Sequence, residues 1–251
     1  MREFAIDTAK RAGEVLHSYF ESSLTRETKD DTSCVTVADR EAERVIVERI
    51  VAAYPEHGIL GEEGTRINPD AEYQWVIDPL DGTANFASGI PIFAVSIALT
   101  RGGESVLGVV YNPITNALYV AEKGRGAEYN GKPIHVSEET ETTGLVTYGY
   151  GPAHKDRFER IFVEARKRFK SHRILGSTAL ELCFLARGGT EGLVCLGLHP
   201  WDYAAAALIL TEAGGIVTEP DGSPWKLESR TLIGSNGAIH ESLRKLLTDV
   251  G

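Results

Sequence analysis

The sequence predicts two lobes of different character, an α+β lobe over residues 1–138 and an α/β lobe over residues 139–251. The first lobe opens with two helical patterns and continues in strand-like runs joined by Gly and Asn-Pro turns. In the second lobe, short strand-like runs alternate with helical ones, which is typical of α/β architecture. The boundary is expected within VSEETET, and a chain of 251 residues is long enough for two such lobes.

Two amphipathic helices are expected at the start of the chain. In the first, apolar residues recur at intervals of three and four: Ile6, Ala9, Gly13, Leu16 and Phe20. A second such pattern follows the polar stretch SSLTRETKDDTS and contains Ala42, Val45, Ile46, Ile50 and Ala53. Thr36 and Asp39 stand at its start in T-x-x-D spacing, which is typical of a helix N-terminus.

The remaining elements follow in order. Strands are expected at HGIL, EYQWVID, PIFAVSIALTRGG, ESVLGVVYNP and NALYVAEKGRGAEYNGKPI. In KGRGAEYNG the closely spaced glycines predict a turn, because the segment lacks the G-K-[ST] of a phosphate-binding loop. The second lobe begins with strand-like GLVTYGY and a charged helix, HKDRFERIFVEARKRFK. Strands and helices then alternate through HRILG, TALELCFLARGG, EGLVCLG, PWDYAAAALILTEAGG, GIVTEP, RTLIGSN and AIHESLRKLLTDV.

Composition and charge exclude several classes of protein. The formal net charge of −10 argues against a nucleic-acid partner, because proteins that coat nucleic acid need a basic surface. Three cysteines in no paired spacing predict neither a disulfide framework nor a zinc site. The N-terminal segment has no apolar signal-peptide core, and no apolar run reaches membrane-spanning length. We therefore expect a soluble cytoplasmic protein with no membrane partner.

Several acidic residues stand at the ends of expected elements and not on outer helix faces. They are Asp39, Glu62, Glu63, Asp78, Asp81 and Asp202. Each has a structural explanation when it is taken alone. Asp39 and Asp202 could cap helices, Glu62 and Glu63 could be turn residues, and the two other aspartates could form an Asx turn around Pro79.

The stretch WVIDPLDGTANF argues for more than a turn. Asp78 continues an apolar run, and no Lys or Arg lies between Gln74 and Arg101 to offset a buried carboxylate nearby. A distant arginine could do so, but a hard cation such as Mg²⁺ binds oxygen ligands of this kind. The following Gly82 allows close backbone approach, and a helix start at Thr83 would direct N–H groups at an anion. Together these features predict a site for a phosphate ester and divalent cations.

Four blocks of the sequence resemble the signature motifs of the inositol monophosphatase family. They are GEE at residues 61–63, DPLDGTANF at 78–86, WDYAAAA at 201–207 and VTVADREAE around Asp39. Their order and spacing fit over nearly the whole chain. The resemblance implies a layered αβαβα sandwich of the inositol monophosphatase and fructose-1,6-bisphosphatase type. It also implies a homodimer with two or three Mg²⁺ per subunit and inhibition by Li⁺.

The resemblance also implies roles for individual residues. The first metal ion would be bound by Glu62, Asp78 and the Leu80 carbonyl, and the second by Asp78, Asp81 and Asp202. A third, weaker metal site would lie near Glu62.

The phosphate and the attacking water would be held by a second group of residues. Gly82 and Thr83 would bind phosphate through their backbone N–H groups. Thr83 and Asp39 would orient and deprotonate the attacking water, and Glu63 would support that network. A bound cation lowers the pKa of water by several units, so such a site needs no nucleophilic Ser or Cys.

The sequence departs from the family at positions that face the substrate. Inositol-preferring members carry a glutamate seven residues before the WD aspartate, where this chain has Cys195. A thiol accepts hydrogen bonds from hydroxyl groups poorly, although Cys195 could also be an ordinary buried strand residue. Ser177 and Thr178 lie where the family brings the chain near the substrate. His154, Lys155 and Arg157 could face a second anionic group or begin a solvated helix.

The sequence thus predicts a Mg²⁺-dependent phosphomonoesterase that acts on a small phosphorylated metabolite similar to inositol monophosphate. Relatives cleave fructose 1,6-bisphosphate, histidinol phosphate, phosphoadenosine phosphate or NADP, and the first two activities are the alternatives within the same fold. A third alternative is a regulatory, transcription-associated protein that retains the fold. The presence of every expected metal ligand favours an enzyme.

Overall fold

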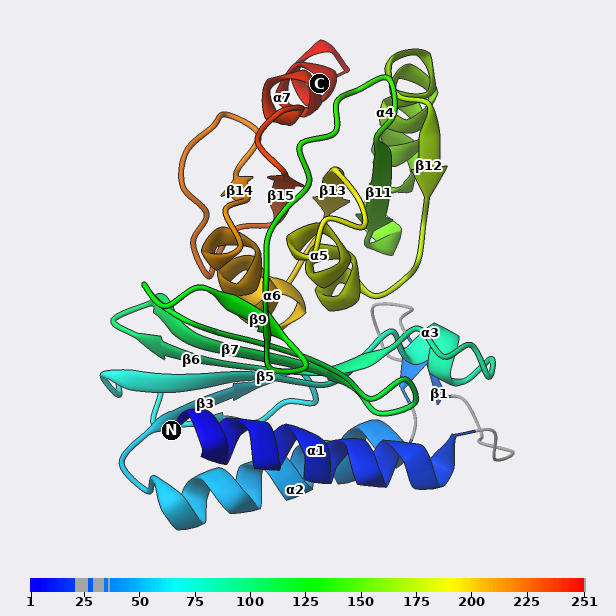
Figure 1. Ribbon diagram of the computed structural model, residues 1–251. Coiled ribbons are helices and arrows are strands. Elements are labelled where there is room, and N and C mark those ends of the chain that lie inside the picture. Colours follow the sequence, from blue (N-terminus) through cyan, green and yellow to red (C-terminus); the bar gives the residue numbers. More distant parts are fainter. Residues whose placement is uncertain (21–26, 29–33, 36, 251) are drawn as a thin grey trace.

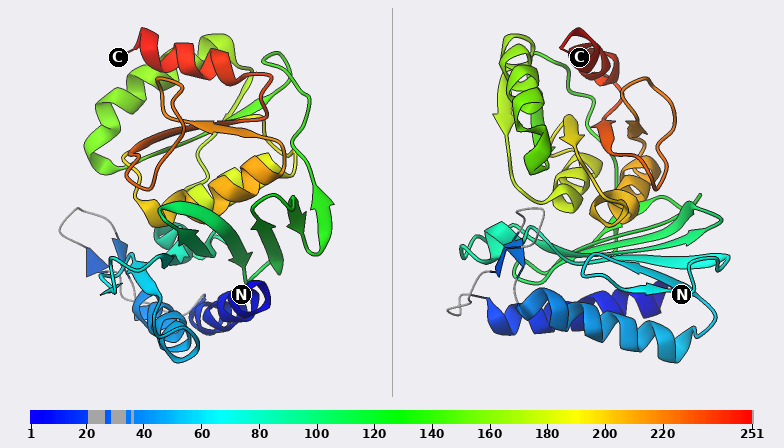
Figure 2. Two further views of the ribbon diagram at one scale, coloured as in Figure 1. Left: turned by 90° about the vertical axis from the view of Figure 1, so that its left-hand side faces the viewer. Right: turned by 180° about the vertical axis from the view of Figure 1, so that it is seen from behind.

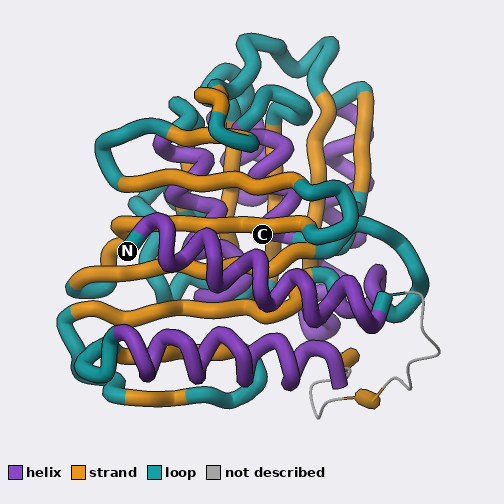
Figure 3. Tube along the Cα trace, turned by 60° about the horizontal axis from the view of Figure 1, so that its bottom comes forward, coloured by secondary structure: helices purple, strands orange, loops and turns teal. Residues whose placement is uncertain are grey.

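The computed structural model describes residues 1–20, 27–28, 34–35 and 37–250. Within these residues, helices and sheets alternate in five layers (Figure 1). The outer layer of the first lobe holds α1 (Arg2–Tyr19) and α2 (Val37–Ala53), which lie side by side beneath an eight-stranded sheet (Figure 3). This arrangement confirms the layered αβαβα sandwich.

The central helix layer lies between the two sheets and positions the site. It consists of α5 (Thr178–Ala186) and α6 (Pro200–Glu212), and both views of Figure 2 show it enclosed by strands. A five-stranded sheet covers its other side, and α4 (Lys155–Arg168) and α7 (His240–Asp249) form the last layer. A single turn of 3₁₀ helix, η1 (Pro152–His154), precedes α4.

The larger sheet has the strand order β10-β9-β8-β7-β6-β5-β3-β4. Its neighbours pair antiparallel except for β3 and β5, which are parallel. The strands are β3 (Gly58–Gly61), β4 (Arg66–Ile67), β5 (Tyr73–Asp81), β6 (Ala94–Arg101), β7 (Glu104–Asn112), β8 (Ala117–Glu122), β9 (Ala127–Tyr129) and β10 (Lys132–Ile134). A separate ribbon pairs β1 (Glu27–Thr28) with β2 (Cys34–Val35), and the short helix α3 (Thr83–Phe86) follows β5.

The smaller sheet is mixed, with the order β12-β11-β13-β15-β14. Its strands are β11 (Leu145–Tyr150), β12 (Ser171–Arg173), β13 (Gly192–Leu196), β14 (Ile216–Thr218) and β15 (Thr231–Ser235). Strand β11 runs parallel to β12 and β13, whereas β15 is antiparallel to β13 and β14. The alternation of strands and helices in the sequence indicated this lobe but did not specify its antiparallel edge.

Helix α6 packs directly on the larger sheet. Its central residues 203–210 are all buried, and it contacts β5, β6 and β7. The approach is closest at Gly108 of β7, where an added Cβ would lie 2.5 Å from the Ala205 carbonyl oxygen. Ser105 Oγ also donates a hydrogen bond to the Ala204 carbonyl at 2.9 Å. Contact with the sheet therefore fixes the position of α6, and with it the position of Asp202 in its first turn.

The structure differs from two of the expectations about local structure. The strand expected to end at Asp78 continues to Asp81, with a register shift where Pro79 interrupts the pairing with β6. Proline has no N–H to donate, so a bulge is the ordinary way for it to enter a sheet. The strand expected at HRILG ends at Arg173, and the residues after it form a loop toward the site.

Some expectations fall on parts of the chain that need separate mention. Thr36 and most of SSLTRETKDDTS lie outside the described residues. The expected lobe boundary falls between β10 and β11, the two strands that border the change from one sheet to the other. Among the described helices, none combines the length and apolar character that a membrane-spanning helix needs.

We expect Gly108→Val to destabilise the protein by about 2–3 kcal/mol, because the new side chain would push against the α6 backbone. Equilibrium unfolding in urea measures this change. Val106→Ile is the matched control, since Val106 lies on the same strand but packs against the other face of the sheet. Equal stability of Gly108→Val and the control would contradict the close packing of α6 on β7.

Candidate active site

The acidic residues converge on a pocket of about 400 Å³ at the start of α6. Glu62, Asp81 and Asp202 line it, from three segments that are far apart in the sequence. Asp78 lies just behind, 2% exposed, on the same strand as Asp81. The structure therefore brings together all four carboxylates that the sequence analysis proposed as metal ligands.

The bulge in β5 places its two aspartates differently. Strand β5 lies between β3 and β6 and is buried from Trp75 to Asp81. Asp78 Oδ1 accepts a hydrogen bond from the Leu80 N–H at 2.9 Å, so the Asx turn considered above is present. The turn satisfies one carboxylate oxygen and directs the chain past Pro79, which brings Asp81 to the pocket wall.

Asp81 accepts hydrogen bonds from the N-terminus of α5. Its Oδ2 accepts hydrogen bonds from Ser177 Oγ at 2.5 Å and from the Ala179 N–H at 2.8 Å. Its Oδ1 accepts the Thr178 N–H at 3.2 Å. The free N–H groups of a helix start favour a negative charge, so α5 stabilises the ionised form of Asp81. Ser177 and Thr178, expected near the substrate, line the pocket and at the same time hold Asp81.

Asp202 and Glu62 complete the acidic group. Asp202 lies in the first turn of α6, and its Oδ2 accepts the His199 N–H at 2.7 Å. Glu62 follows β3, where its own N–H donates to the Ile77 carbonyl at 3.2 Å. Both are thus held by the ends of regular elements, and both face Asp81 across the pocket.

The carboxylates disturb one another's ionisation. Burial raises the pKa of Asp78 well above its usual range, and the charges of Glu62, Asp81 and Asp202 raise it further. Burial also raises the pKa of Asp202, with a smaller contribution from Asp81. The pKa of Asp81 rises to about 6 through burial, although the hydrogen bond from Ser177 opposes the rise. Repulsion within the group is therefore a property of the folded chain.

The oxygen atoms around the pocket are suitable ligands for a hard divalent cation. Among the described residues, no lysine or arginine lines the pocket, and the charge of Arg230 only partly opposes the rise in the pKa of Asp202. Carboxylate and carbonyl oxygens are the ligands that Mg²⁺ prefers. In the described parts of the chain, no three His, Cys, Asp or Glu side chains form a ready-made metal-binding group. Instead, carboxylate oxygens of Asp81 and Asp202 accept hydrogen bonds from O–H and N–H groups of the protein.

Asp39 and Thr83 meet beside this group. Thr83 Oγ1 lies 3.1 Å from Asp39 Oδ1 and 3.1 Å from the Leu80 carbonyl oxygen, and its single hydrogen can serve either. Asp39 is fully buried in the first turn of α2. Gly82 has φ of 98°, and an added Cβ would lie 2.9 Å from the Ile92 carbonyl oxygen, so glycine is required there.

Glu43 is a site residue that the sequence analysis missed. Its Oε2 accepts the Glu63 N–H at 2.9 Å, and its Oε1 accepts Thr65 Oγ1 at 2.6 Å. An added Cβ on Gly61 would lie 2.6 Å from Glu43 Oε2, so the loop of residues 61–65 fits closely around this carboxylate. The available signal was its position four residues after Asp39, on the same helix face.

Two further residues were missed on the other side of the site. Asn85 Nδ2 donates to the carbonyls of Ile92 at 2.8 Å and Leu175 at 2.7 Å, which joins the α3 segment to the loop before α5. Glu181 is 1% exposed and lines the pocket. A glutamate within the otherwise apolar helix TALELCFLA was the signal for it.

Other candidates lie outside the pocket. Cys195 is fully buried in β13, with Sγ 3.9 Å from Thr178 Oγ1, as its reading as a strand residue implied. His154 packs on Gly197, and it, Lys155 and Arg157 are not among the lining residues. Within KGRGAEYNG, residues 123–126 form the expected turn between β8 and β9, AEY is β9 itself, and the final Asn-Gly turns the chain into β10.

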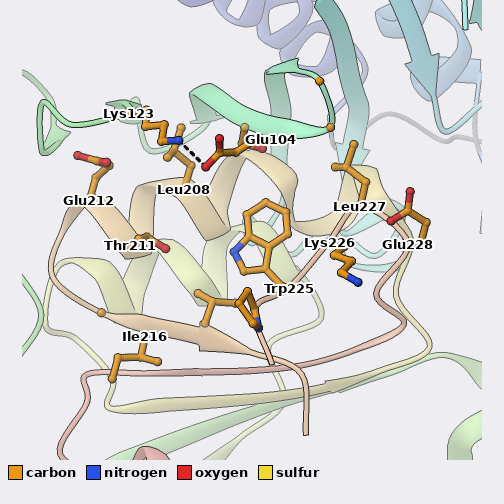
Figure 4. A pocket seen from close by; sticks show the side chains of 16 residues that line it. Glu104, Lys123, Leu208, Thr211, Glu212, Ile216, Trp225, Lys226, Leu227 and Glu228 are labelled. Carbon is orange, nitrogen blue, oxygen red and sulfur yellow. Dashed lines mark ion pairs between the residues drawn. The ribbon is translucent and has the colours of Figure 1, made fainter. Parts of the chain in front are cut away.

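A second cavity, of about 670 Å³, lies at the other end of α6. Figure 4 shows the indole of Trp225 and the side chain of Leu208 facing it, with an ion pair between Lys123 and Glu104 at its edge. None of the carboxylates discussed above lines this cavity. Chemistry and not size therefore identifies the smaller pocket as the candidate active site.

Comparison with known proteins agrees with the sequence motifs. A curated relative, the Nus factor SuhB of Vibrio cholerae, is 40% identical over 243 residues, which cover 94% of this chain and 91% of the relative. The fructose-1,6-bisphosphatase/inositol-1-monophosphatase of Thermotoga maritima is 36% identical over 249 residues, covering 99% and 96%. The inositol-1-monophosphatase of Rhizobium meliloti is 40% identical over 225 residues, covering 87% and 84%.

Solved structures and a family profile extend the agreement to the fold. The extragenic suppressor protein suhB of Bartonella henselae superposes with a TM-score of 0.93 at 34% identity, over 98% of this chain and 97% of that one. An IMPase of Thermotoga maritima superposes with a TM-score of 0.92 at 36% identity, over 99% and 96%. The profile of the inositol monophosphatase family matches residues 1–251. The chain therefore belongs to the inositol monophosphatase family.

Proposed function

We propose that the protein is a Mg²⁺-dependent phosphomonoesterase that releases inorganic phosphate from a small phosphorylated alcohol, with inositol monophosphate as the reference substrate. The observation that carries the proposal is the group of four carboxylates at a pocket to whose wall the described residues contribute no lysine or arginine. Such a group is repulsive by itself and needs divalent cations, which in turn attract a phosphate dianion.

The proposed ligands divide into two sets that share Asp78. Glu62, Asp78 and the Leu80 carbonyl would hold one Mg²⁺, and Asp78, Asp81 and Asp202 would hold another, with a weaker third ion near Glu62. When bound, these ions would supply the positive charge that activates water near neutral pH and neutralises the phosphate oxygens. Li⁺ inhibition is part of the proposal, as is a cytoplasmic homodimer.

The chain's own residues would move the proton and orient the ester. Thr83 Oγ1 lies 3.1 Å from Asp39 Oδ1, so the threonine oxygen can accept a hydrogen from water while its own hydrogen is directed at Asp39. The proton would then rest on the Asp39 carboxylate. Backbone N–H groups of Gly82 and Thr83 would bind phosphate oxygens, and Glu63 would support the water through the loop that Glu43 holds.

A regulatory role is the second candidate. It is supported by the name Nus factor SuhB, which a 40% identical relative carries. The two functions are separable, because a regulatory surface does not require metal ligands. Fructose-1,6-bisphosphatase or histidinol-phosphatase activity is an alternative for the same site, and the name of the Thermotoga relative supports the first of these.

The proposal is tested by phosphate release from a panel of esters with and without Mg²⁺. The panel holds inositol 1-phosphate, fructose 1,6-bisphosphate, histidinol phosphate, phosphoadenosine phosphate and NADP. We expect Mg²⁺-dependent release, reduced by Li⁺. Asp81→Asn should lower turnover by more than about a hundredfold, because it removes a charge that both the cation and the phosphate depend on.

In Asp81→Asn the remaining oxygen can keep the hydrogen bonds from Ser177 Oγ and the Ala179 N–H, and the longer one from the Thr178 N–H is lost, so we expect a folded protein of somewhat lower stability. Circular dichroism and gel filtration check this. Near-normal Mg²⁺-dependent rates in the folded variant would show that Asp81 is not a ligand. No release from any ester by the wild-type protein in Mg²⁺ would favour the regulatory candidate.

Mg²⁺ should also raise the melting temperature, because a bound cation relieves the repulsion within the group. A thermal-shift titration measures the effect, with Asp78→Asn as the variant that should respond least, since Asp78 belongs to both proposed ligand sets. Glu72→Gln, an exposed residue paired with Arg101, is the control that should respond like wild type. A melting temperature independent of Mg²⁺ would argue against clustered ligands.

Glu43→Ala should raise the Mg²⁺ concentration needed for half-maximal rate by about tenfold or more, because the Glu62–Glu63 loop loses its acceptor. Glu43→Gln keeps one side-chain oxygen and should recover part of the affinity. Glu48→Ala, an exposed position on the same helix, is the control. If Glu43→Ala and Glu48→Ala needed the same Mg²⁺ concentration as wild type, Glu43 would have no positioning role.

A further inference from the structure

Arg66 is a charged residue beside the pocket that the proposed chemistry does not use. It follows the turn of residues 61–65, which leads from β3 into β4 and carries Glu62. The guanidinium carbon of Arg66 lies 5.3 Å from the centre of the Trp201 ring. Trp201 lines the pocket in the first turn of α6, next to Asp202. Arg66 therefore contacts both of the elements that bring Glu62 and Asp202 to the pocket.

On one side, Arg66 closes the turn that carries Glu62. Its Nη1 donates hydrogen bonds to the Gly61 carbonyl at 2.6 Å and to the Thr65 carbonyl at 2.8 Å. That nitrogen has two hydrogens, so it can serve both carbonyls at once. The Gly61 N–H also donates to the Thr65 carbonyl, at 2.9 Å. The two ends of the turn are thus held together by one planar group.

The turn depends on such contacts from outside. Within the described part of the chain, an added Cβ on Gly64 would meet no atom within 4 Å, so the tip of the turn is open on that side. Glu43 holds the turn from α2, through the Glu63 N–H and the Thr65 side chain. Because α2 lies on the other side of the larger sheet from α6, it is the Arg66 contact that joins the turn to α6.

On the α6 side, Trp201 belongs to a stack of planar groups. Its ring and the imidazole of His199 lie 4.8 Å apart and are nearly parallel, at an angle of 2°. Arg230 Nη1 donates a hydrogen bond to His199 Nδ1 at 3.0 Å. The stack fixes the plane of the indole, and tryptophan is the aromatic residue to which a guanidinium binds most strongly. Arg66 therefore meets a surface that is held in one orientation.

We propose that Arg66 is a positioning residue that fixes Glu62 relative to Asp202 by joining the turn of residues 61–65 to the start of α6. The inference rests on the proposed function, in which Glu62 and Asp202 belong to the two different ligand sets that share Asp78. A guanidinium that holds both elements sets the spacing of the two ligand sets from outside the pocket wall. Loss of Arg66 should therefore weaken Mg²⁺ binding more than it weakens binding of the ester.

The test measures Mg²⁺ binding directly, by isothermal titration calorimetry on the metal-free protein without substrate. In Arg66→Ala the dissociation constant should rise by about threefold or more, because the variant loses the guanidinium–indole contact and the support of a ligand-bearing turn. The KM for inositol 1-phosphate at saturating Mg²⁺ should stay within about twofold of the wild-type value, since Arg66 is not among the residues that line the pocket.

A double-mutant cycle with Trp201→Leu tests the route by which Arg66 acts. If Arg66 acts through the indole, Arg66→Ala should change the dissociation constant little once the indole has been removed. An equal rise in both backgrounds would show that Arg66 does not act through Trp201, and would overturn the inference. Arg66→Gln keeps an N–H donor but has no charge for the indole. It is the second variant should Arg66→Ala not fold, and it should also weaken Mg²⁺ binding.

The control is Arg101→Ala. Arg101 is also exposed and also lies over an aromatic ring, that of Tyr73, with 5.5 Å between the guanidinium carbon and the ring centre. Tyr73 stands at the opposite end of β5 from Asp81. Replacement of Arg101 should leave the Mg²⁺ dissociation constant at the wild-type value. Arg66→Ala would behave in the same way if its role were merely structural.

The outcomes separate the two proposals. If Arg66→Ala weakens Mg²⁺ binding and Arg101→Ala does not, the positioning role is supported. If wild type binds Mg²⁺ and releases phosphate, and Arg66→Ala binds Mg²⁺ as tightly, the role of Arg66 is overturned and the phosphatase function stands. If wild type binds no Mg²⁺, the proposed function fails and this inference fails with it.

Discussion

Repulsion among buried carboxylates is the constraint on which the rest of the site depends. Asp78 and Asp81 lie on a central strand, and the part of the adjoining pocket wall that the structure describes contains no lysine or arginine. A sheet interior normally excludes such groups, and here the bulge at Pro79 admits them. The fold therefore holds negative charge that it does not neutralise by itself, and a divalent cation is the simplest group that would complete it.

The same carboxylates join the layers of the molecule. Asp81 belongs to the larger sheet, yet its hydrogen bonds come from the first residues of α5. Asn85 extends the connection to the Leu175 carbonyl on the loop before that helix. Helix α6 begins beside them, and its close contact with Gly108 fixes its position on the sheet. A site built at such a junction is held by several rigid elements, which favours accurate placement of its ligands.

The sequence predicted those parts of this arrangement that depend on the local pattern of apolar and polar residues. Helical periodicity indicated α1 and α2, and the apolar run before Asp78 indicated a buried strand. What it missed depends on contacts between distant segments. Nothing near Ser177 in the sequence indicates that its hydroxyl binds Asp81, and nothing near Glu43 indicates the loop of residues 61–65. The antiparallel edge of the smaller sheet was missed for the same reason, because alternating elements do not fix strand direction.

Buried acids with different partners indicate different roles within one fold. Glu43 accepts hydrogen bonds from Glu63 and Thr65, and Glu191 accepts them from Leu145 and Ser137, so both act as acceptors that order loops. Glu181 accepts the N–H groups of Leu175 and Gly176, so it orders the loop before α5 in the same way. A buried carboxyl is costly unless its hydrogen bonds are made, and in these three acids the loop that each one orders supplies the donors. The aspartates of β5 differ from them, because the charges of Glu62, Asp81 and Asp202 act on Asp78, and a cation would relieve that repulsion.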